Sequence, residues 1–302
     1  MKSSVGILLL VFSSTILVAQ EHLPIIDMHL HAIPAESVRD EVAIPGLTRQ
    51  PTEEAIMRET LRTLERNNVV KALVSGPVEM IYKWKAAAPD RLIASPYIMY
   101  DQPWPKLVDL RAAYSHRKLG ALGEIGAQYL GLSLSSPEFE PYLALAEEFD
   151  VPVSVHTGSG PPGVVYSCCP RFRTALGNPI LVEEALVRHP KLRLYIMHAG
   201  YPFFDETVSL LTAYPQVYVD LAVIDWVLPR EEFHDYLRRL VRAGFGKRLM
   251  FGSDQMVWPQ TIEIGIKAIE SADFLTAEQK RDIFYSNAAR FLRIEEKNKV
   301  PR

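Results

Sequence analysis

The sequence has 302 residues, of which 48% are hydrophobic and 23% charged, a composition typical of a globular protein with a large core. Its 33 basic and 36 acidic residues give a net charge of -3, which excludes a strongly basic surface for nucleic acid or an anionic membrane. We therefore expect a small molecule as partner, and a chain long enough for two ordinary domains or one barrel.

The first twenty residues have the features of a secretory signal peptide. Lys2 gives a short positive region, residues 5–18 form an apolar run, and Leu17-Val18-Ala19 is an acceptable cleavage site. We predict that residues 1–20 are removed and that residues 21–302, a single domain, are exported to the periplasm or secreted. An uncleaved membrane anchor is the alternative, although the run is shorter than the roughly twenty residues that a span needs. No membrane partner is expected after cleavage.

The first predicted strand covers residues 25–31 and carries the pair His29-x-His31. Alternation along a strand places two sets of side chains on opposite faces: Ile25, Asp27, His29 and His31 on one, and Ile26, Met28 and Leu30 on the other. Two imidazoles on one face are typical of a metal site, and two solvated histidines are the alternative. Asp27 would lie one layer below His29, where it could orient an imidazole, and a capped strand carboxylate is the equally weighted alternative.

Strands and helices alternate through the rest of the chain. After a loop over residues 32–51, helices are predicted over 52–67, 77–88, 104–116, 137–149, 179–188, 203–214 and 230–243. The intervening strands are predicted over 69–75, 92–100, 119–125, 151–156, 192–198, 217–221 and 248–252, and two last helices over 258–271 and 276–292. Eight βα units predict an α/β fold with a closed, parallel (β/α)8 barrel. An open doubly wound sheet is the alternative, but no G-x-G-x-x-G follows any strand.

Residues of the metal-ligand type gather at one end of this predicted barrel. Active sites of (β/α)8 barrels lie at the carboxyl ends of the strands. The residues found there are His29, His31, Glu124, His156, His198 and Asp254. The other four histidines precede the fold or lie in helical stretches, and we leave them out of the site: His22, His116, His189 and His234.

This set of side chains suits a catalytic divalent metal. Zinc accepts imidazole nitrogen and carboxylate oxygen, and a first shell of His29, His31, His156 and Asp254 would leave a position for water. Asp254 is the expected general base for metal-activated water. His198 could contact the substrate oxygen or bind a second ion, and Glu124 could bridge two ions. A buried carboxylate paired with a basic residue is the alternative for Glu124.

In these residues the chain resembles the amidohydrolase superfamily of metal-dependent hydrolases, and more narrowly its amidohydrolase-2 branch. The resemblance rests on IIDMHLHA, VPVSVHTG, HPKLRLYIMHAGYPF, RLMFGSDQ and the closing FYSNAARFLRI. It implies a distorted (β/α)8 barrel, a divalent ion that is usually zinc, with manganese as another option, and water attack with Asp254 as base.

One segment departs from this branch. LGALGEIGAQY, around Glu124, resembles the G-E-I-G segment of TatD-type deoxyribonucleases, in which the glutamate is a metal ligand. No lysine stands there, so a carbamylated-lysine bridge is not expected. One or two ions remain open, with two slightly favoured, and the acidic charge and the export signal argue against a TatD-like phosphodiesterase.

Several functions fit these residues. We expect an exported hydrolase of a lactone, amide or ester, with a decarboxylase of an aromatic or unsaturated acid and a non-catalytic metal-binding barrel as alternatives. Arg171 and Arg173 would favour an anionic substrate if either faced the site. Four aromatic residues could form an apolar wall or simply pack: Trp104, Tyr129, Tyr201 and Trp258.

The sequence leaves two further features without an assignment. Cys168 and Cys169 are adjacent, closer than the usual disulfide range, so a bond between them would be unusual, although an exported protein could oxidise them. A homo-oligomer is neither favoured nor excluded.

Overall fold

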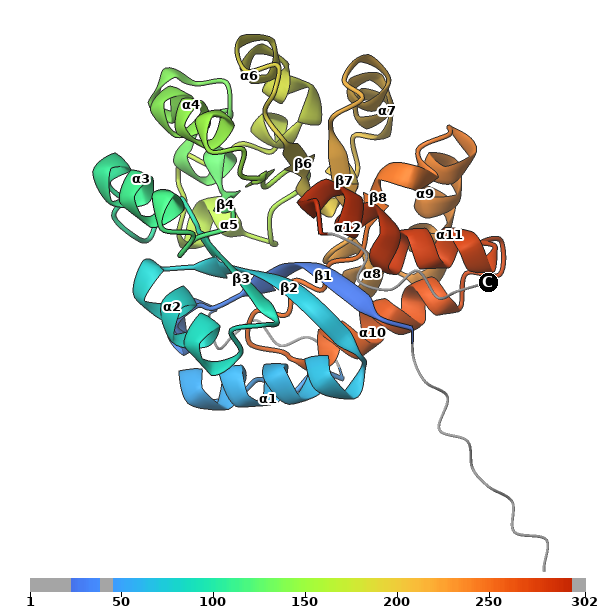
Figure 1. Ribbon diagram of the computed structural model, residues 1–302. Helices are drawn as coiled ribbons and strands as arrows, with labels where there is room; N and C mark the ends of the chain where they lie inside the picture. Colours follow the sequence, from blue (N-terminus) through green and yellow to red (C-terminus); the bar gives the residue numbers. More distant parts are fainter. Residues whose placement is uncertain (1–22, 39–45, 295–302) are drawn as a thin grey trace, which may run out of the picture.

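The computed structural model describes residues 23–38 and 46–294, so the predicted signal peptide over residues 1–20 lies outside the described part of the chain. Eight strands follow one another through the described part (Figure 1). They are β1 (Ile25–His31), β2 (Val69–Gly76), β3 (Leu92–Pro96), β4 (Leu122–Ile125), β5 (Val153–Val155), β6 (Leu194–Ile196), β7 (Tyr218–Asp220) and β8 (Leu249–Met250).

Helices separate the strands, as the alternating pattern predicts. They are α1 (Glu53–Arg66), α2 (Val78–Ala87), α3 (Leu107–Ser115), α4 (Glu140–Glu148), α5 (Val164–Ser167), α6 (Glu183–Arg188), α7 (Phe204–Ala213), α8 (Ile224–Val227), α9 (Arg230–Arg242), α10 (Gln260–Glu270), α11 (Ala277–Arg281) and α12 (Asn287–Leu292). The start of α1 illustrates the local cause, because the Thr52 side chain accepts a hydrogen bond from the backbone of Ala55 at 3.2 Å.

The strands form two parallel sheets, β1-β2-β3 and β4-β5-β6-β7-β8. Two short seams join them. At one seam Ile98 donates to the carbonyl of Glu124 and accepts from Gly126, both at 2.9 Å. At the other, Met28 donates to the carbonyl of Phe251 at 2.9 Å. These bonds close the strands into the predicted (β/α)8 barrel, distorted at both seams.

The prediction of strict alternation along β1 is wrong. The pairing of β1 with β2 shifts in register between Asp27 and Leu30, which is the signature of a bulge. Ile26 and Met28 therefore pack in one apolar cluster, whereas Leu30 joins Ile25 in the other. The bulge changes the side on which β1 places its residues, which a period-two pattern cannot indicate.

Strands β3 to β8 are shorter than predicted, and β5, β6 and β8 end before His156, His198 and Asp254. His198 follows β6 in a turn with φ of 58°, and Asp254 lies beyond β8 with φ of 45°. Positive φ is uncommon for residues other than glycine and often marks functional positions. The predicted helix over 276–292 is also divided, since a π-helical turn over residues 282–286 separates α11 from α12.

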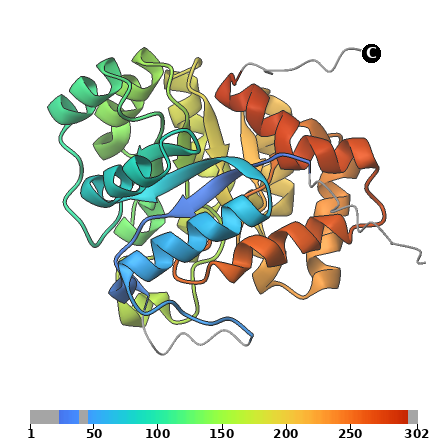
Figure 2. The same ribbon diagram turned by 60° about the horizontal axis from the view of Figure 1, so that its bottom comes forward.

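The helices cover the barrel and enclose its core. Figure 2 shows α1 and α10 side by side along one flank. A second apolar cluster joins Met28 of β1 to Phe291 of α12, so the last helix packs against the first strand. None of the helices in residues 23–38 and 46–294 has the length and apolar character that a membrane span requires.

Candidate metal centre

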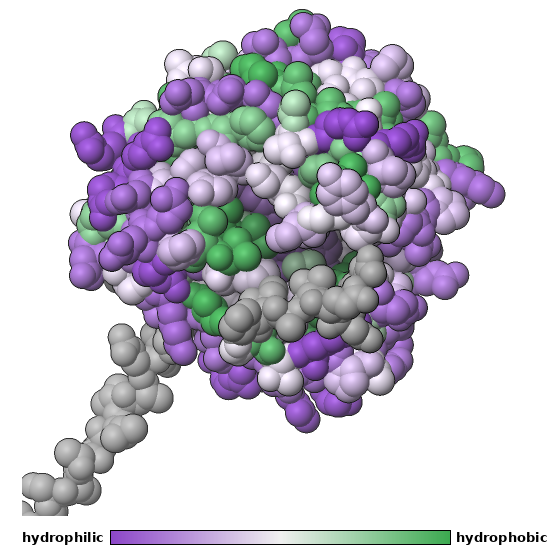
Figure 3. All heavy atoms as spheres, turned by 180° about the vertical axis from the view of Figure 1, so that it is seen from behind, coloured by the Kyte–Doolittle hydropathy of each residue, from purple (hydrophilic) through white to green (hydrophobic). Residues whose placement is uncertain are grey.

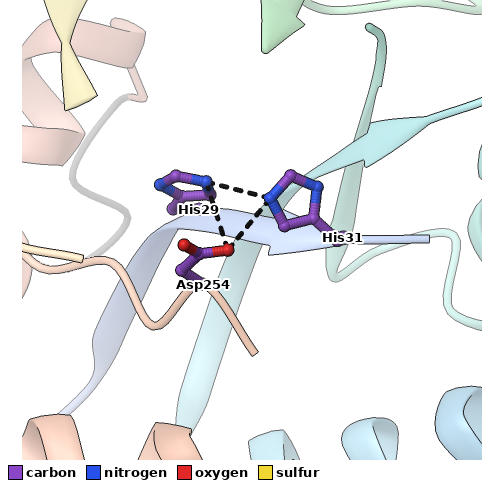
Figure 4. A group of neighbouring side chains, drawn as sticks. All are labelled: His29, His31 and Asp254. Carbon is purple, nitrogen blue, oxygen red and sulfur yellow. Dashed lines mark hydrogen bonds and ion pairs between the residues drawn. The ribbon is translucent and has the colours of Figure 1, made fainter. Parts of the chain in front are cut away.

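Two histidines of β1 and one aspartate beyond β8 form the first group of candidate ligands (Figure 4). The Nε2 atoms of His29 and His31 lie 3.1 Å apart. Asp254 Oδ1 lies 3.0 Å from His31 Nε2 and 3.7 Å from His29 Nε2. All three residues are buried, and the backbone of Asp254 donates to the carbonyl of His29 at 2.8 Å, which fixes the two segments together.

A second group lies against the first, formed by Glu124 at the end of β4, His156 after β5 and His198 after β6. Glu124 also lies close to two members of the first group, because its Oε2 is 3.3 Å from His31 Nε2 and 3.6 Å from His29 Nε2. The glycine before it is required, since Gly123 has φ of 124° and a β-carbon there would meet Ser154 Oγ at 2.3 Å. The structure thus brings the six side chains named from the sequence close together.

Hydrogen bonds at the outer ring nitrogens fix how the histidines point. His29 Nδ1 bonds Asp220 Oδ2 at 3.0 Å, and His31 Nδ1 lies 3.1 Å from Ser75 Oγ. His198 Nδ1 lies 3.0 Å from the carbonyl of Ala222. Since a carbonyl only accepts, the neutral form of the His198 ring carries its proton on Nδ1 and keeps a lone pair on Nε2.

The buried charges of the two groups act on one another. Burial disfavours the protonated form of His31, but the carboxylates of Asp254 and Glu124 outweigh it and raise its pKa to about 9. Burial would raise the pKa of Asp254, yet the charge of His29 and the bond from His31 lower it to about 2. Burial also lowers the pKa of His156, to about 3, with repulsion from His198 adding to the effect. The two carboxylates therefore favour positive charge at His31.

These residues fit a divalent cation. Imidazole nitrogens and carboxylate oxygens are the donors that zinc and manganese accept. No lysine or arginine pairs with Glu124 or Asp254 in the described ranges 23–38 and 46–294, so a pair with a basic residue does not explain Glu124. His156 Nδ1 is buried without a hydrogen-bond partner there, as expected of an atom that binds a cation.

A comparison of the sequence with known families agrees with this geometry. The sequence model of the amidohydrolase family, in its second branch, matches residues 26–294, which is nearly all of the described chain. The chain belongs to the amidohydrolase family.

Known proteins similar to this amidohydrolase differ in activity. Protein fluG of Emericella nidulans is 22% identical over 161 residues, which are 48% of this chain and only 18% of that protein. A probable 2-pyrone-4,6-dicarboxylic acid hydrolase from Acinetobacter baumannii, solved with citric acid bound, is 17% identical; the match covers 90% of this chain and 100% of the other, with a TM-score of 0.63. A dihydroxybenzoic acid decarboxylase from Polaromonas sp. JS666, solved with manganese and 2-nitroresorcinol, is 12% identical, with 90% and 97% covered and a TM-score of 0.61. Identities this low show the shared fold alone.

Asp220 is a site residue of this amidohydrolase that the sequence analysis missed. Its Oδ2 bonds His29, and its Oδ1 accepts from the backbone of His198 at 2.8 Å and of Ala222 at 3.2 Å. Asp27 follows the second of its two expected roles, that of a capped strand carboxylate, because its Oδ1 accepts from the backbone amides of His29 and Ser253, both at 3.0 Å. Asp220 could have been found from the sequence, because it lies at the carboxyl end of β7, where barrel active sites are built.

The histidines that the sequence analysis set aside bond elsewhere wherever the structure describes them. His189 lies between Glu140 and Glu147, at 3.1 and 3.2 Å, and joins α4 to the end of α6. His116 and His234 bond backbone carbonyls, at 2.7 and 2.9 Å, and His22 lies outside the described residues.

Among the four aromatic candidates, Tyr129 reaches the metal centre. Its hydroxyl lies 3.3 Å from His156 Nε2. Trp104 stacks on Phe139, and the hydroxyl of Tyr201 bonds Glu232. Trp258 is buried, and its ring faces that of Trp226. Packing thus accounts for these three residues.

The loop after β5 borders an open pocket of about 360 Å³, lined by Phe172 and Arg173 among others. Arg173 donates to the carbonyls of Pro170 and Phe172, and the side chain of Arg171 is exposed. Cys168 and Cys169, in the same loop, form a disulfide bond. Figure 3 shows the face opposite to the view of Figure 1, which is hollowed near its centre.

Proposed function

We propose that this amidohydrolase is exported and hydrolyses an ester, lactone or amide bond of a small, anionic molecule with the help of two divalent cations, most simply zinc. The observation that carries the proposal is the position of Glu124. Its Oε2 lies 3.3 Å from His31 Nε2, and the same carboxylate is grouped with His156 and His198. A ligand shared by two groups is what a two-ion hydrolytic site requires.

The residues of the site would have two functions in the reaction, namely binding the cations and transferring a proton. His29, His31 and Asp254 would hold one cation, and His156 and His198 the other, with Glu124 between them. Bound cations supply Lewis acidity at the scissile carbonyl and lower the pKa of a water molecule. Asp254 stays ionised in this environment, so its carboxylate can accept the proton of the attacking water and pass it to the leaving group.

One neighbouring feature supports an anionic substrate. Arg173 lines the pocket of the loop after β5, and Phe172 of the same pocket packs against Tyr129 beside His156. A guanidinium at this position can pair with a carboxylate. The matched hydrolase was solved with citric acid and the matched decarboxylase with an aromatic inhibitor. These ligands support a carboxylic acid or a compound derived from one as the substrate class.

Non-oxidative decarboxylation of an aromatic or unsaturated acid is the second candidate, favoured by the matched decarboxylase of the same fold. An assay in ¹⁸O-water separates the two reactions. Zinc-loaded protein is offered lactones, esters and amides of carboxylic acids alongside dihydroxybenzoates. Hydrolysis places ¹⁸O in the acid product, whereas release of carbon dioxide with no ¹⁸O in the remaining organic product would select decarboxylation. Asp254→Asn should abolish turnover with metal retained, and full activity in this variant would remove Asp254 from the mechanism.

The number of ions is tested by counting metal per chain in the wild type and in Glu124→Gln. We expect close to two ions, falling to one in the variant, because the amide that replaces the carboxylate carries no charge to bridge two cations. A single ion in both proteins would contradict the two-ion site and strengthen the decarboxylase candidate.

A further inference from the structure

Tyr129 is held against the metal centre by contacts from three directions. It lies in a short helical turn over residues 127–130 directly after β4, and its ring meets that of His156 edge to face, with 5.0 Å between centroids. Tyr100 stacks on it at 5.9 Å, and Phe172 packs its edge at 5.2 Å. Because these three rings fix it, the hydroxyl of Tyr129 has little freedom to leave His156.

The two ring nitrogens of His156 have different surroundings. Nε2 faces the hydroxyl of Tyr129 at 3.3 Å. Nδ1 is buried and has no hydrogen-bond partner in residues 23–38 and 46–294. The ring of His198 lies 4.7 Å away, and Glu124 completes the group. A neutral imidazole carries one proton, and a proton on Nδ1 would leave a buried donor unsatisfied, whereas a proton on Nε2 has the phenol oxygen as acceptor.

We propose that Tyr129 is a positioning residue for His156: its phenol oxygen accepts a hydrogen bond from Nε2–H and leaves the Nδ1 lone pair for the cation shared with Glu124 and His198. The inference rests on the proposed metal site and assigns to Tyr129 the role that Asp220 has for His29. Partners of this kind set the tautomer and the orientation of a ligating imidazole.

Asp220 and Tyr129 differ in charge, and this difference predicts that the two ions are bound with different affinities. Asp220 bonds His29 Nδ1 through a carboxylate, which increases the basicity of the ligand. The phenol of Tyr129 is a neutral partner at physiological pH, since the ordinary pKa of tyrosine is about 10. We therefore expect the ion at His156 to be the more weakly bound of the two, and Tyr129→Phe to affect that ion and not the one at His29, His31 and Asp254.

The experiment uses the full-length protein labelled with ¹⁵N-histidine and zinc alone as the probe. Ring-nitrogen NMR of the zinc-loaded wild type should show His156 coordinated through Nδ1 with Nε2 protonated, His156 being assigned from the signals lost in His156→Gln. Chelator titration should then show release of the weaker zinc at a concentration 10- to 100-fold lower in Tyr129→Phe, the range for loss of such a partner.

Tyr100→Phe is the matched control, because it removes a hydroxyl from the adjoining ring of the same stack. We expect wild-type affinity for both ions in this variant, and Phe at 129 keeps the ring packing. Coordination of His156 through Nε2, or unchanged zinc release in Tyr129→Phe, would overturn the inference and leave the proposed metal site intact. Failure of the wild type to bind zinc at all would overturn the proposed site, and the inference with it.

Discussion

Replacing Asp220 by Asn should weaken metal binding through the tautomer of His29 without removing any metal ligand. Asp220 Oδ1 accepts from two backbone amides, His198 and Ala222, while Oδ2 faces His29 Nδ1. The Asn side chain can keep both backbone bonds only if its oxygen takes the place of Oδ1 and its NH2 group takes that of Oδ2. The reverse orientation would leave two buried backbone N–H groups unpaired, at about 1–3 kcal/mol each.

In the favoured orientation an N–H of the Asn side chain points at His29 Nδ1. Nδ1 must then accept, so the proton of the imidazole moves to Nε2, the atom that faces His31 and Glu124. A protonated Nε2 cannot bind a cation, and we expect zinc affinity to fall by about 10- to 100-fold, or about 1.4–2.7 kcal/mol.

Zinc affinity is measured by competition with a chromogenic chelator for the wild type, Asp220→Asn and the exposed control Asp273→Asn. The thermal melt of metal-free Asp220→Asn should stay near that of the wild type, because both backbone bonds survive. Asp220→Ala, which loses all three bonds, should melt clearly lower. Wild-type zinc affinity in Asp220→Asn would refute the reasoning about His29.

Two further predictions concern pH. Because the pKa of His31 is about 9, a proton competes with the cation for this side chain. Zinc affinity should therefore rise from pH 6.5 to about 9 and then level off, and calorimetry in buffers of different ionisation enthalpy should detect the released proton. Constant zinc affinity between pH 7 and 9 would contradict this prediction. In the metal-free protein the same shift stabilises the fold below pH 6.5, and that contribution is lost as the pH rises through 9. Asp225, buried with both carboxyl oxygens unpartnered in the described residues, has its pKa raised well above the usual range by burial and by Asp27 and Asp220. The carboxyl group of Asp225 ionises above about pH 4 in the unfolded chain but stays neutral in the folded protein, so the free energy of unfolding of the metal-free protein should fall as the pH rises. Urea unfolding of Asp225→Asn should show a weaker dependence of this free energy on pH. The same dependence in both proteins would exclude this contribution of Asp225.

The sequence predicts the strand order well, because apolar runs and helix signals alternate. The candidate ligands lie at or just beyond the carboxyl ends of the strands, although most strands are shorter than predicted. The prediction of the fold class and that of the family are both confirmed. The residues that orient the ligands are harder to find, since the bond between Asp220 and His29 joins segments 191 residues apart. Local sequence patterns do not indicate such a long-range pairing. The rule that active-site residues lie at the carboxyl ends of barrel strands would have included Asp220 if it had been applied to β7.

Backbone irregularities mark the other limit of the sequence. The bulge in β1 and the positive φ values of His198 and Asp254 depend on contacts with distant strands. No residue type at these positions signals them, because histidine and aspartate occur at ordinary φ elsewhere. Tyr129 shows the same limit: four aromatic residues had equal standing in the sequence, and only packing distinguishes them.

The seam between β1 and the segment after β8 gives a proposed cation a structural role in addition to its chemical one. β1 stands at the edge of one sheet and the segment after β8 at the edge of the other, and few backbone bonds connect them. His29 and His31 lie on one side of this seam and Asp254 on the other, so a cation held by all three would cross-link the beginning of the domain to its end. Contacts so distant in sequence form late in folding, since the loop between them must close first. A bound cation would thus stabilise the contact between β1 and the segment after β8, and it should slow amide hydrogen exchange most strongly in these two segments.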